Sequence, residues 1–220
     1  MTGSHLKAAV ALAILGVLGA RPGFAQVSDD DRARLAPLPR LFEALDAKPG
    51  ARIADVGSGD GFYARQLAGA VAPAGRITAS DIDSEGLGRL KSRIETEKLT
   101  NIDVVLGKPD DPLLEANVYD AVLIRNAYHE MTEHESMLRH IRDALKPGGR
   151  LVVAEKIHEK RRGLSRKDQV AVHEIASEIV EAELLAAGFQ IRKRDESFEP
   201  FTETENPGGY WLIVAVKSKE

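Results

Sequence analysis

The chain lacks cysteine altogether and has no excess of basic residues. Its 220 residues include 30 Lys and Arg against 34 Asp and Glu, which gives a formal net charge of -4. The absence of cysteine excludes disulfides, thiolate catalysis and zinc sites with thiolate ligands. The acidic balance argues against non-specific binding to nucleic acid, which needs a basic surface. We therefore expect no nucleic-acid partner and no metal site.

Apolar runs long enough to span a membrane are also missing near the N-terminus. The run from Ala8 to Ala20 has thirteen residues, whereas a membrane-spanning helix needs about 20. Lys7 precedes this run and Gly23-Phe24-Ala25 follows it, which is the order of a secretory signal peptide. We expect residues 1–25 to be an export leader that brings the protein to a membrane and makes it exported or periplasmic. The alternatives are an uncleaved membrane anchor, or an amphipathic helix packed on a cytoplasmic protein.

Residues 26–220 are long enough to form one globular domain with a full core. Hydrophobic residues make up 43% of the chain, and no internal repeat is present. Five short apolar segments alternate with stretches of helical apolar spacing, which is typical of an α/β fold with parallel strands. Two more apolar segments, 189–196 and 210–217, close the chain without a helix between them, so we expect them to pair antiparallel.

A glycine-rich turn follows the first apolar segment. Gly57, Gly59 and Gly61 come directly after the run Arg-Ile-Ala-Asp-Val, and an apolar pattern at helical spacing follows. Glycines at alternate positions let the backbone turn tightly and approach a ligand, because no Cβ holds the ligand away. The amides that open the following helix point into the same space. The segment therefore predicts a strand, a ligand-binding turn and a helix.

The spacing of these glycines disfavours a dinucleotide. A dinucleotide fold would have Gly-x-Gly-x-x-Gly, but Phe62 occupies the sixth position and Gly61 comes one residue early. Asp55, two residues before the first glycine, would repel a pyrophosphate and accept hydrogen bonds from a cationic ligand. We expect the ligand to be a nucleoside that carries an amino acid.

The heptapeptide 55–61, Asp-Val-Gly-Ser-Gly-Asp-Gly, resembles the first motif of the class I S-adenosylmethionine-dependent methyltransferases, Asp/Glu-x-Gly-x-Gly-x-Gly. The Lys-Pro-Gly-Gly junction at 146–149 is a second point of resemblance, and the likeness extends over 49–217. It implies a Rossmann-like α/β fold, a doubly wound seven-stranded sheet of order 3-2-1-4-5-7-6 with its last strand antiparallel and helices on both faces. It also implies S-adenosyl-L-methionine as the cofactor.

Two acids are expected near the nucleoside. Asp81 ends the second expected strand, where a carboxylate can accept hydrogen bonds from both ribose hydroxyls; the alternative is a solvated aspartate that caps the next helix, as Asp83 could do. Asp110 follows the third strand, where the resembled family often carries an acid near adenine, but Lys108 stands at that position here and Asp110 could equally face water. The predicted cofactor-binding residues are Asp55, Gly57, Ser58, Gly59, Gly61, Asp81, Ile82, Asp110 and Asn126.

The acceptor side is expected in the loop after the fourth strand, since ligands of open α/β sheets lie beyond the carboxyl ends of the strands. The stretch 126–131, Asn-Ala-Tyr-His-Glu-Met, resembles the Asn-x-x-His stretch of small-molecule methyltransferases near the quinone-ring C-methyltransferases. It lacks the Asn/Asp-Pro-Pro-Tyr of enzymes that methylate nucleic-acid bases. We predict that His129 orients or deprotonates the acceptor, with a structural histidine as the alternative. Glu155 and His158, at the end of the fifth strand, complete the predicted catalytic residues.

Two further features leave alternatives open. The basic run 160–167 is either a solvated loop or a contact for an anionic substrate or membrane headgroups. His173 is expected on a long helix with Ile175, Ile179 and Leu184 that ends at Gly188, either lining the substrate pocket or packing.

The function predicted from these residues is in-line methyl transfer from S-adenosylmethionine to a small molecule whose identity, and whose accepting atom, the sequence does not indicate. A module of the same fold that binds an adenosyl ligand without turnover is the first alternative, because fold does not fix function. A nicotinamide-dependent oxidoreductase is the second, and Phe62 and Asp55 disfavour it. An exported methyltransferase would also need donor outside the cytoplasm, where the donor is made.

Overall fold

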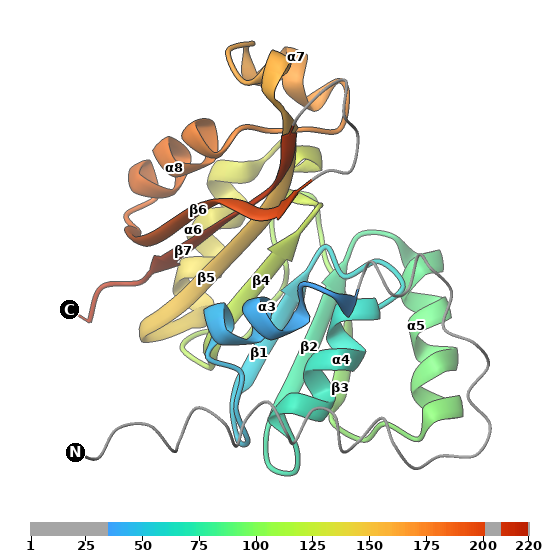
Figure 1. The fold of residues 1–220 in the computed structure, drawn as a ribbon. Coiled ribbons are helices and arrows are strands. Elements are labelled where there is room, and N and C mark those ends of the chain that lie inside the picture. The colour runs from blue at the N-terminus through green and yellow to red at the C-terminus, as the bar shows by residue number, and fades with distance from the viewer. Residues whose placement is uncertain (1–34, 201–207, 220) are drawn as a thin grey trace, which may run out of the picture. The chain divides into compact units, whose positions relative to one another are not determined.

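The computed structural model describes residues 35–200 and 208–219, so the leader predicted at 1–25 lies outside the described residues. The described residues form one seven-stranded sheet of order β3-β2-β1-β4-β5-β7-β6 (Figure 1). The strands are β1 (Arg52–Val56), β2 (Arg76–Asp81), β3 (Ile102–Leu106), β4 (Tyr119–Arg125), β5 (Leu145–His158), β6 (Gln190–Pro200) and β7 (Gly208–Val216).

The pairing of the strands confirms the predicted topology. β1 pairs in parallel with β2 and β4, β2 with β3, and β4 with β5. β7 runs antiparallel to both β5 and β6. Parallel neighbours need a crossover between them, whereas β6 and β7 follow each other directly along the chain. The carboxyl ends of β1, β2, β4 and β5 therefore meet at one edge of the sheet.

Helices cover both faces of this sheet. Figure 1 shows α3 and α4 on one face and α6 and α8 on the other. The α-helices are α3 (Leu38–Leu45), α4 (Phe62–Val71), α5 (Ser84–Glu97), α6 (His134–Ala144), α7 (Arg166–Val170) and α8 (Ser177–Ala186), with short 3-10 turns η1 (Tyr128–Glu130) and η2 (Glu159–Arg161). Within the described part of the chain, no helix is both long and apolar enough to cross a bilayer.

The middle of the sheet is buried. Residues 151–154 of β5 are fully buried on both faces, as expected for a central strand under two helical layers. Trp211 of β7 is also fully buried, and its indole N–H donates to the carbonyl oxygen of Ile175 at 2.8 Å. This packing fixes the position of the segment before α8.

The long helix predicted through Ile175 is wrong. The structure has two shorter helices, α7 and α8, with a turn at 171–176 between them. Gln169 holds this turn, because its buried amide donates to the carbonyl oxygens of Arg161, Arg162 and Leu164 and accepts from the backbone N–H of Ala176 at 2.7 Å. His173 therefore lies in a turn with φ +58° rather than on a helix.

Candidate functional site

The glycine turn between β1 and α4 has the left-handed backbone that its glycines permit. Gly57, Gly59 and Gly61 have φ values of +76°, +54° and +74°. A Cβ on Gly57 would lie 2.4 Å from the Cβ of Ala127, so the turn packs directly on the loop after β4. A Cβ on Gly59 would meet nothing within 4 Å. Gly57 thus serves close packing, whereas Gly59 borders open space that a ligand can enter.

Asp81 faces this turn from the end of β2. Its Oδ2 accepts from the backbone N–H of Gly59 at 2.7 Å and its Oδ1 from the N–H of Asp83 at 2.8 Å. Asp83 in turn caps α5, since its side chain accepts from the N–H of Glu85 at 2.9 Å. The structure therefore gives the helix cap to Asp83 and leaves Asp81 beside the glycine turn.

Asp55 is a buried carboxyl under the same turn. Desolvation raises the pKa of Asp55 to about 7; a hydrogen bond from the backbone of Ala64 opposes this rise, and the charge of Asp81 adds to it. Its Oδ2 is buried without a hydrogen-bond partner, and so is the Oγ of Ser58. Buried polar atoms without partners are rare in folded proteins. These two mark a place where a polar ligand would complete the structure.

The other predicted cofactor residues follow strands β2, β3 and β4. Ile82, directly after Asp81, is 61% exposed, an apolar surface suited to an adenine ring. Asp110 is exposed in the loop after β3. Asn126 is exposed after β4 with φ +51°, and its Oδ1 accepts from the hydroxyl of Tyr210 at 3.4 Å. Their contacts with a cofactor stay predictions.

His129 and Glu155 form a buried pair between the loop after β4 and strand β5. The His129 Nδ1 lies 2.9 Å from Glu155 Oε2, and Glu155 Oε1 accepts from the backbone N–H of Tyr128 at 2.6 Å. Burial of the imidazole lowers the pKa of His129, but the hydrogen bond and charge of Glu155 outweigh it and leave that pKa raised. Because Nδ1 donates to Glu155, Nε2 of the neutral ring carries the free lone pair.

His158 does not join this pair. Its ring nitrogen Nδ1 contacts the buried carboxylate of Glu174, and its backbone N–H donates to Glu174 Oε2 at 3.1 Å. Arg161 also donates to Glu174, at 2.5 Å. The structure thus separates the predicted catalytic residues into the pair His129 and Glu155, and a second cluster around Glu174.

Arg125, which the sequence reasoning passed over, lies in an aromatic cage at the end of β4. Its guanidinium carbon lies 5.0, 5.7 and 4.7 Å from the ring centroids of Tyr63, Phe198 and Tyr210. It donates to the hydroxyl of Tyr63 at 2.5 Å and to Glu199 at 2.7 Å, while its NH1 is buried without a partner. An arginine at the end of an otherwise apolar strand is the sequence signal that could have drawn attention to this position.

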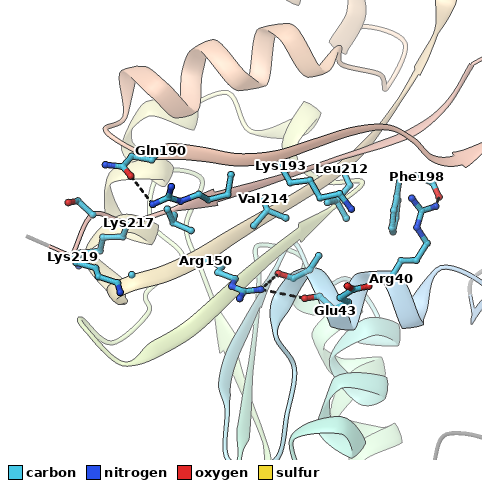
Figure 2. A pocket seen from close by; sticks show the side chains of 15 residues that line it. Arg40, Glu43, Arg150, Gln190, Lys193, Phe198, Leu212, Val214, Lys217 and Lys219 are labelled. Carbon is cyan, nitrogen blue, oxygen red and sulfur yellow. Dashed lines mark hydrogen bonds between the residues drawn. The ribbon is translucent and has the colours of Figure 1, made fainter. Parts of the chain in front are cut away.

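A basic groove of about 520 Å³ lies away from these residues (Figure 2). It runs beside α3 near the amino end of β5, where Arg150 donates to the carbonyl oxygen of Ala44 at 3.0 Å. Its cationic side chains are those of Arg40, Arg150, Arg192, Lys193, Lys217 and Lys219. None of the predicted site residues lines it, so the candidate site is the region around the glycine turn.

Part of the chain matches known proteins. Residues 53–149 match a family described as "Methyltransferase domain". A demethylmenaquinone methyltransferase of Bacillus cereus is 27% identical over 111 residues, which are 50% of this chain and 47% of that enzyme. The chain spans only a third to a half of the length of the curated relatives that it matches.

Solved structures show the same fold. A SAM-dependent methyltransferase of Aquifex aeolicus matches with a TM-score of 0.71 at 21% identity, over 87% of this chain and 94% of that one. At 21% identity this likeness shows the fold, a seven-stranded α/β sheet like that of a class I methyltransferase. The [4+2]-cyclase SpnF matches with the same TM-score at 20% identity, over 96% of this chain and 93% of that one.

Proposed function

We propose that this protein transfers the methyl group of S-adenosylmethionine to a small organic acceptor by direct in-line displacement. The observation that carries the proposal is a pair of buried polar atoms without hydrogen-bond partners at the glycine turn, Asp55 Oδ2 and Ser58 Oγ, beside the carboxylate of Asp81. When bound there, the cofactor would supply an electrophilic methyl group. Such a displacement depends on alignment of the reacting atoms more than on a covalent catalyst.

The residues of the turn fit the parts of this cofactor. A carboxylate offers about four acceptor positions, and Asp81 uses two of them for the backbone N–H groups of Gly59 and Asp83. Two remain for the ribose hydroxyls. The unpartnered oxygen of Asp55 suits the cationic amino group of the methionine part, and the open space at Gly59 admits the ligand against the backbone.

A small acceptor is favoured by charge and by relatives. The net charge of -4 disfavours a nucleic-acid substrate. The name of the related demethylmenaquinone methyltransferase points to a small-molecule substrate for that enzyme. His129 presents Nε2 from the loop that packs on the glycine turn, so we assign it the acceptor side, with Glu155 holding its ring in place.

The deciding experiment is calorimetric titration of the full chain with S-adenosylmethionine, S-adenosylhomocysteine and NADH. We expect saturable binding of both adenosyl ligands and no binding of NADH. Asp81→Ala should weaken adenosyl binding about 100-fold, because charged hydrogen bonds are lost. Asp103→Ala is the matched control, since Asp103 of β3 forms an exposed ion pair with Arg76 of β2. Binding of NADH alone would overturn the proposal.

A second candidate is a protein of this fold that binds the cofactor without transferring its methyl group. The likeness to the cyclase SpnF favours keeping it, because the name of that neighbour denotes another reaction. Incubation of the loaded protein with a library of phenols, quinols, amines and carboxylic acids separates the two candidates. Formation of S-adenosylhomocysteine with any acceptor supports methyl transfer. Unchanged cofactor with all of them, despite tight binding, supports the second candidate.

A further inference from the structure

Three side chains with metal-ligating atoms meet beside the candidate site. His129 and Glu130 come from η1 after β4, and His173 comes from the turn between α7 and α8. One ligand atom of each lies within 4.8 Å of the others. We propose that these three residues bind a divalent transition-metal ion such as Zn²⁺. This revises the expectation from the sequence, which predicted no metal site.

The orientation of His129 suits a metal ligand. Its Nδ1–H donates to Glu155 at 2.9 Å, which directs the lone pair of Nε2 away from the core. Nε2 lies 3.6 Å from Glu130 Oε1. A carboxylate that accepts the second ring N–H is the usual support of a metal-bound histidine, because it fixes the tautomer and makes the ring a better donor. Glu155 is fully buried, and besides the His129 ring its carboxylate accepts from the backbone N–H groups of Tyr128 and His129.

His173 is held toward this pair although its side chain is 71% exposed. Its Nδ1 lies 3.7 Å from Glu130 Oε1, and its ring stands edge-on to that of His129 with centroids 5.6 Å apart. Its backbone has φ +58°, a left-handed conformation that is unfavourable for a residue other than glycine. Gln169 and the buried Ile175 fix the turn on both sides of His173, so the fold maintains this placement.

Two of the three separations between the ligand atoms are close to those of a metal site, and the third, between the two imidazole nitrogens, is within 4.8 Å. Bonds of about 2.0–2.1 Å at tetrahedral angles place neighbouring ligand atoms about 3.3 Å apart. The separations of 3.6 and 3.7 Å to the Glu130 carboxylate need to close by only a few tenths of an ångström. The exposed side chains of Glu130 and His173 can make that adjustment.

The ligand set and its charge favour a cation with an open coordination position. Two imidazoles and one carboxylate are the ligands of many catalytic zinc and non-haem iron sites, which keep a position for water or substrate. The carboxylates of Glu130 and Glu155 attract a cation, and Lys156 opposes them in part. Ala127, two residues before His129, touches Gly57 of the cofactor turn, so the site lies next to the proposed methyl donor.

An ion here would be bound by Nε2 of His129. An acceptor with an oxygen or nitrogen atom would then bind to the ion rather than to His129 directly. This use of the ion rests on the proposed function, whereas binding of the ion does not. The two ideas can therefore be tested apart, by titrating the full chain with metal and with S-adenosylhomocysteine in separate experiments.

The test is calorimetric titration of EDTA-treated, dialysed full chain with ZnCl₂, together with the visible absorption of the Co²⁺ form. We expect one Zn²⁺ per chain with a Kd of about 1 µM or tighter, and Co²⁺ bands of four- or five-coordinate geometry. His173→Ala and Glu130→Gln should each weaken Zn²⁺ binding at least tenfold. Both residues are exposed, so neither substitution should unfold the protein.

Matched controls come from α6, where His140 and Glu135 are also exposed. His140→Ala and Glu135→Gln should leave Zn²⁺ binding unchanged. The proposal is overturned if the wild-type chain binds no stoichiometric Zn²⁺, or if the two ligand variants bind it as well as the two controls do. Zinc binding without adenosyl binding would keep this site and remove the proposed methyl transfer; adenosyl binding without zinc would do the opposite.

Discussion

The two halves of the sheet present different kinds of groups at one edge. The first half consists of strands β1, β2 and β3, and the second half consists of strands β4, β5, β7 and β6. The first half offers a glycine turn, backbone amides and the carboxyls of Asp55 and Asp81, all within about 30 residues of sequence. The second half offers pairs of side chains from distant segments, such as His129 with Glu155 and Arg125 with Glu199. The family match covers residues 53–149 and ends before most of that second half.

Under the proposed function, this difference corresponds to two roles, cofactor binding in the first half and acceptor binding in the second. A fixed ligand can be held by backbone geometry and a few carboxyls in a short motif. An acceptor that differs between proteins needs side chains that can vary, and under the proposed function we expect these in the second half, where His129 lies. Substitutions should therefore separate cofactor binding from acceptor chemistry along the line between β1 and β4.

The largest expected effect comes from the contact between the halves. Gly57→Ala should lower the free energy of unfolding by about 3 kcal/mol, because the new methyl would lie 2.4 Å from the Cβ of Ala127 at φ +76°. Gly59→Ala has only the backbone cost, about 1 kcal/mol. Urea denaturation measures both. The double variant Gly57→Ala with Ala127→Gly should recover part of the loss; equal losses for the two single variants would show that this contact does not fix the turn.

Replacing Asp55 by asparagine should weaken cofactor binding but increase the stability of the folded protein at pH 8. Asp55→Asn should weaken S-adenosylhomocysteine binding about 100-fold, since the acceptor for the amino group loses its charge. The folded pKa of about 7 lies above the unfolded value of 3.8. The wild-type chain therefore loses stability as pH rises from about 4 to 7, and at pH 8 the Asn variant should be more stable by an amount on the order of 2 kcal/mol.

The same pKa predicts how cofactor affinity depends on pH. Protonation of Asp55 removes its charge, so wild-type affinity should fall as pH drops below about 7, approaching tenfold per pH unit. Calorimetry at pH 6, 7 and 8 would measure this dependence, with the Asn variant as the control that should show little change. A flat wild-type profile would remove Asp55 from the binding of the amino group.

A substitution of Arg125 tests whether the second half of the sheet contributes to stability without contributing to cofactor binding. Arg125→Met should lower the free energy of unfolding by about 2 kcal/mol, because the caged guanidinium and its pair with Glu199 are lost. Affinity for S-adenosylhomocysteine should change by less than about threefold. Arg194→Met is the control: its pairs with Glu178 and Glu181 are more exposed and should contribute less than about 1 kcal/mol. Loss of cofactor binding in Arg125→Met would contradict the prediction that cofactor binding depends on the first half alone.

The smallest effect is expected at Asp110. This residue is exposed in the loop after β3, so Asp110→Ala should lower the affinity for S-adenosylhomocysteine by less than about fivefold, the contribution of one solvated hydrogen bond to adenine. Titration beside Asp81→Ala gives the comparison. A loss as large as that of Asp81→Ala would place Asp110 among the principal cofactor contacts.

Local patterns predicted much of this molecule. The antiparallel β7, the glycine turn and the cap at Asp83 follow from apolar periodicity and short motifs, which act over a few residues, whereas the strand order was expected from the resemblance to a family. The predicted helix through His173 failed for a physical reason. Helical spacing continued across 171–176, but the buried amide of Gln169 and the indole of Trp211 take backbone partners there that a continuous helix would need.

What the sequence by itself determined is the architecture and the glycine turn with Asp81 beside it, because glycine conformation and strand-end carboxyls are set locally. Only the tertiary structure decided which side chains of the second half meet. His158 stands beside Glu174 rather than His129, Arg125 lies among aromatic rings of two other elements, and His173 lies beside His129. Such contacts depend on the packing of β5, β7 and α8 around segments far apart in the chain, and no local pattern encodes them.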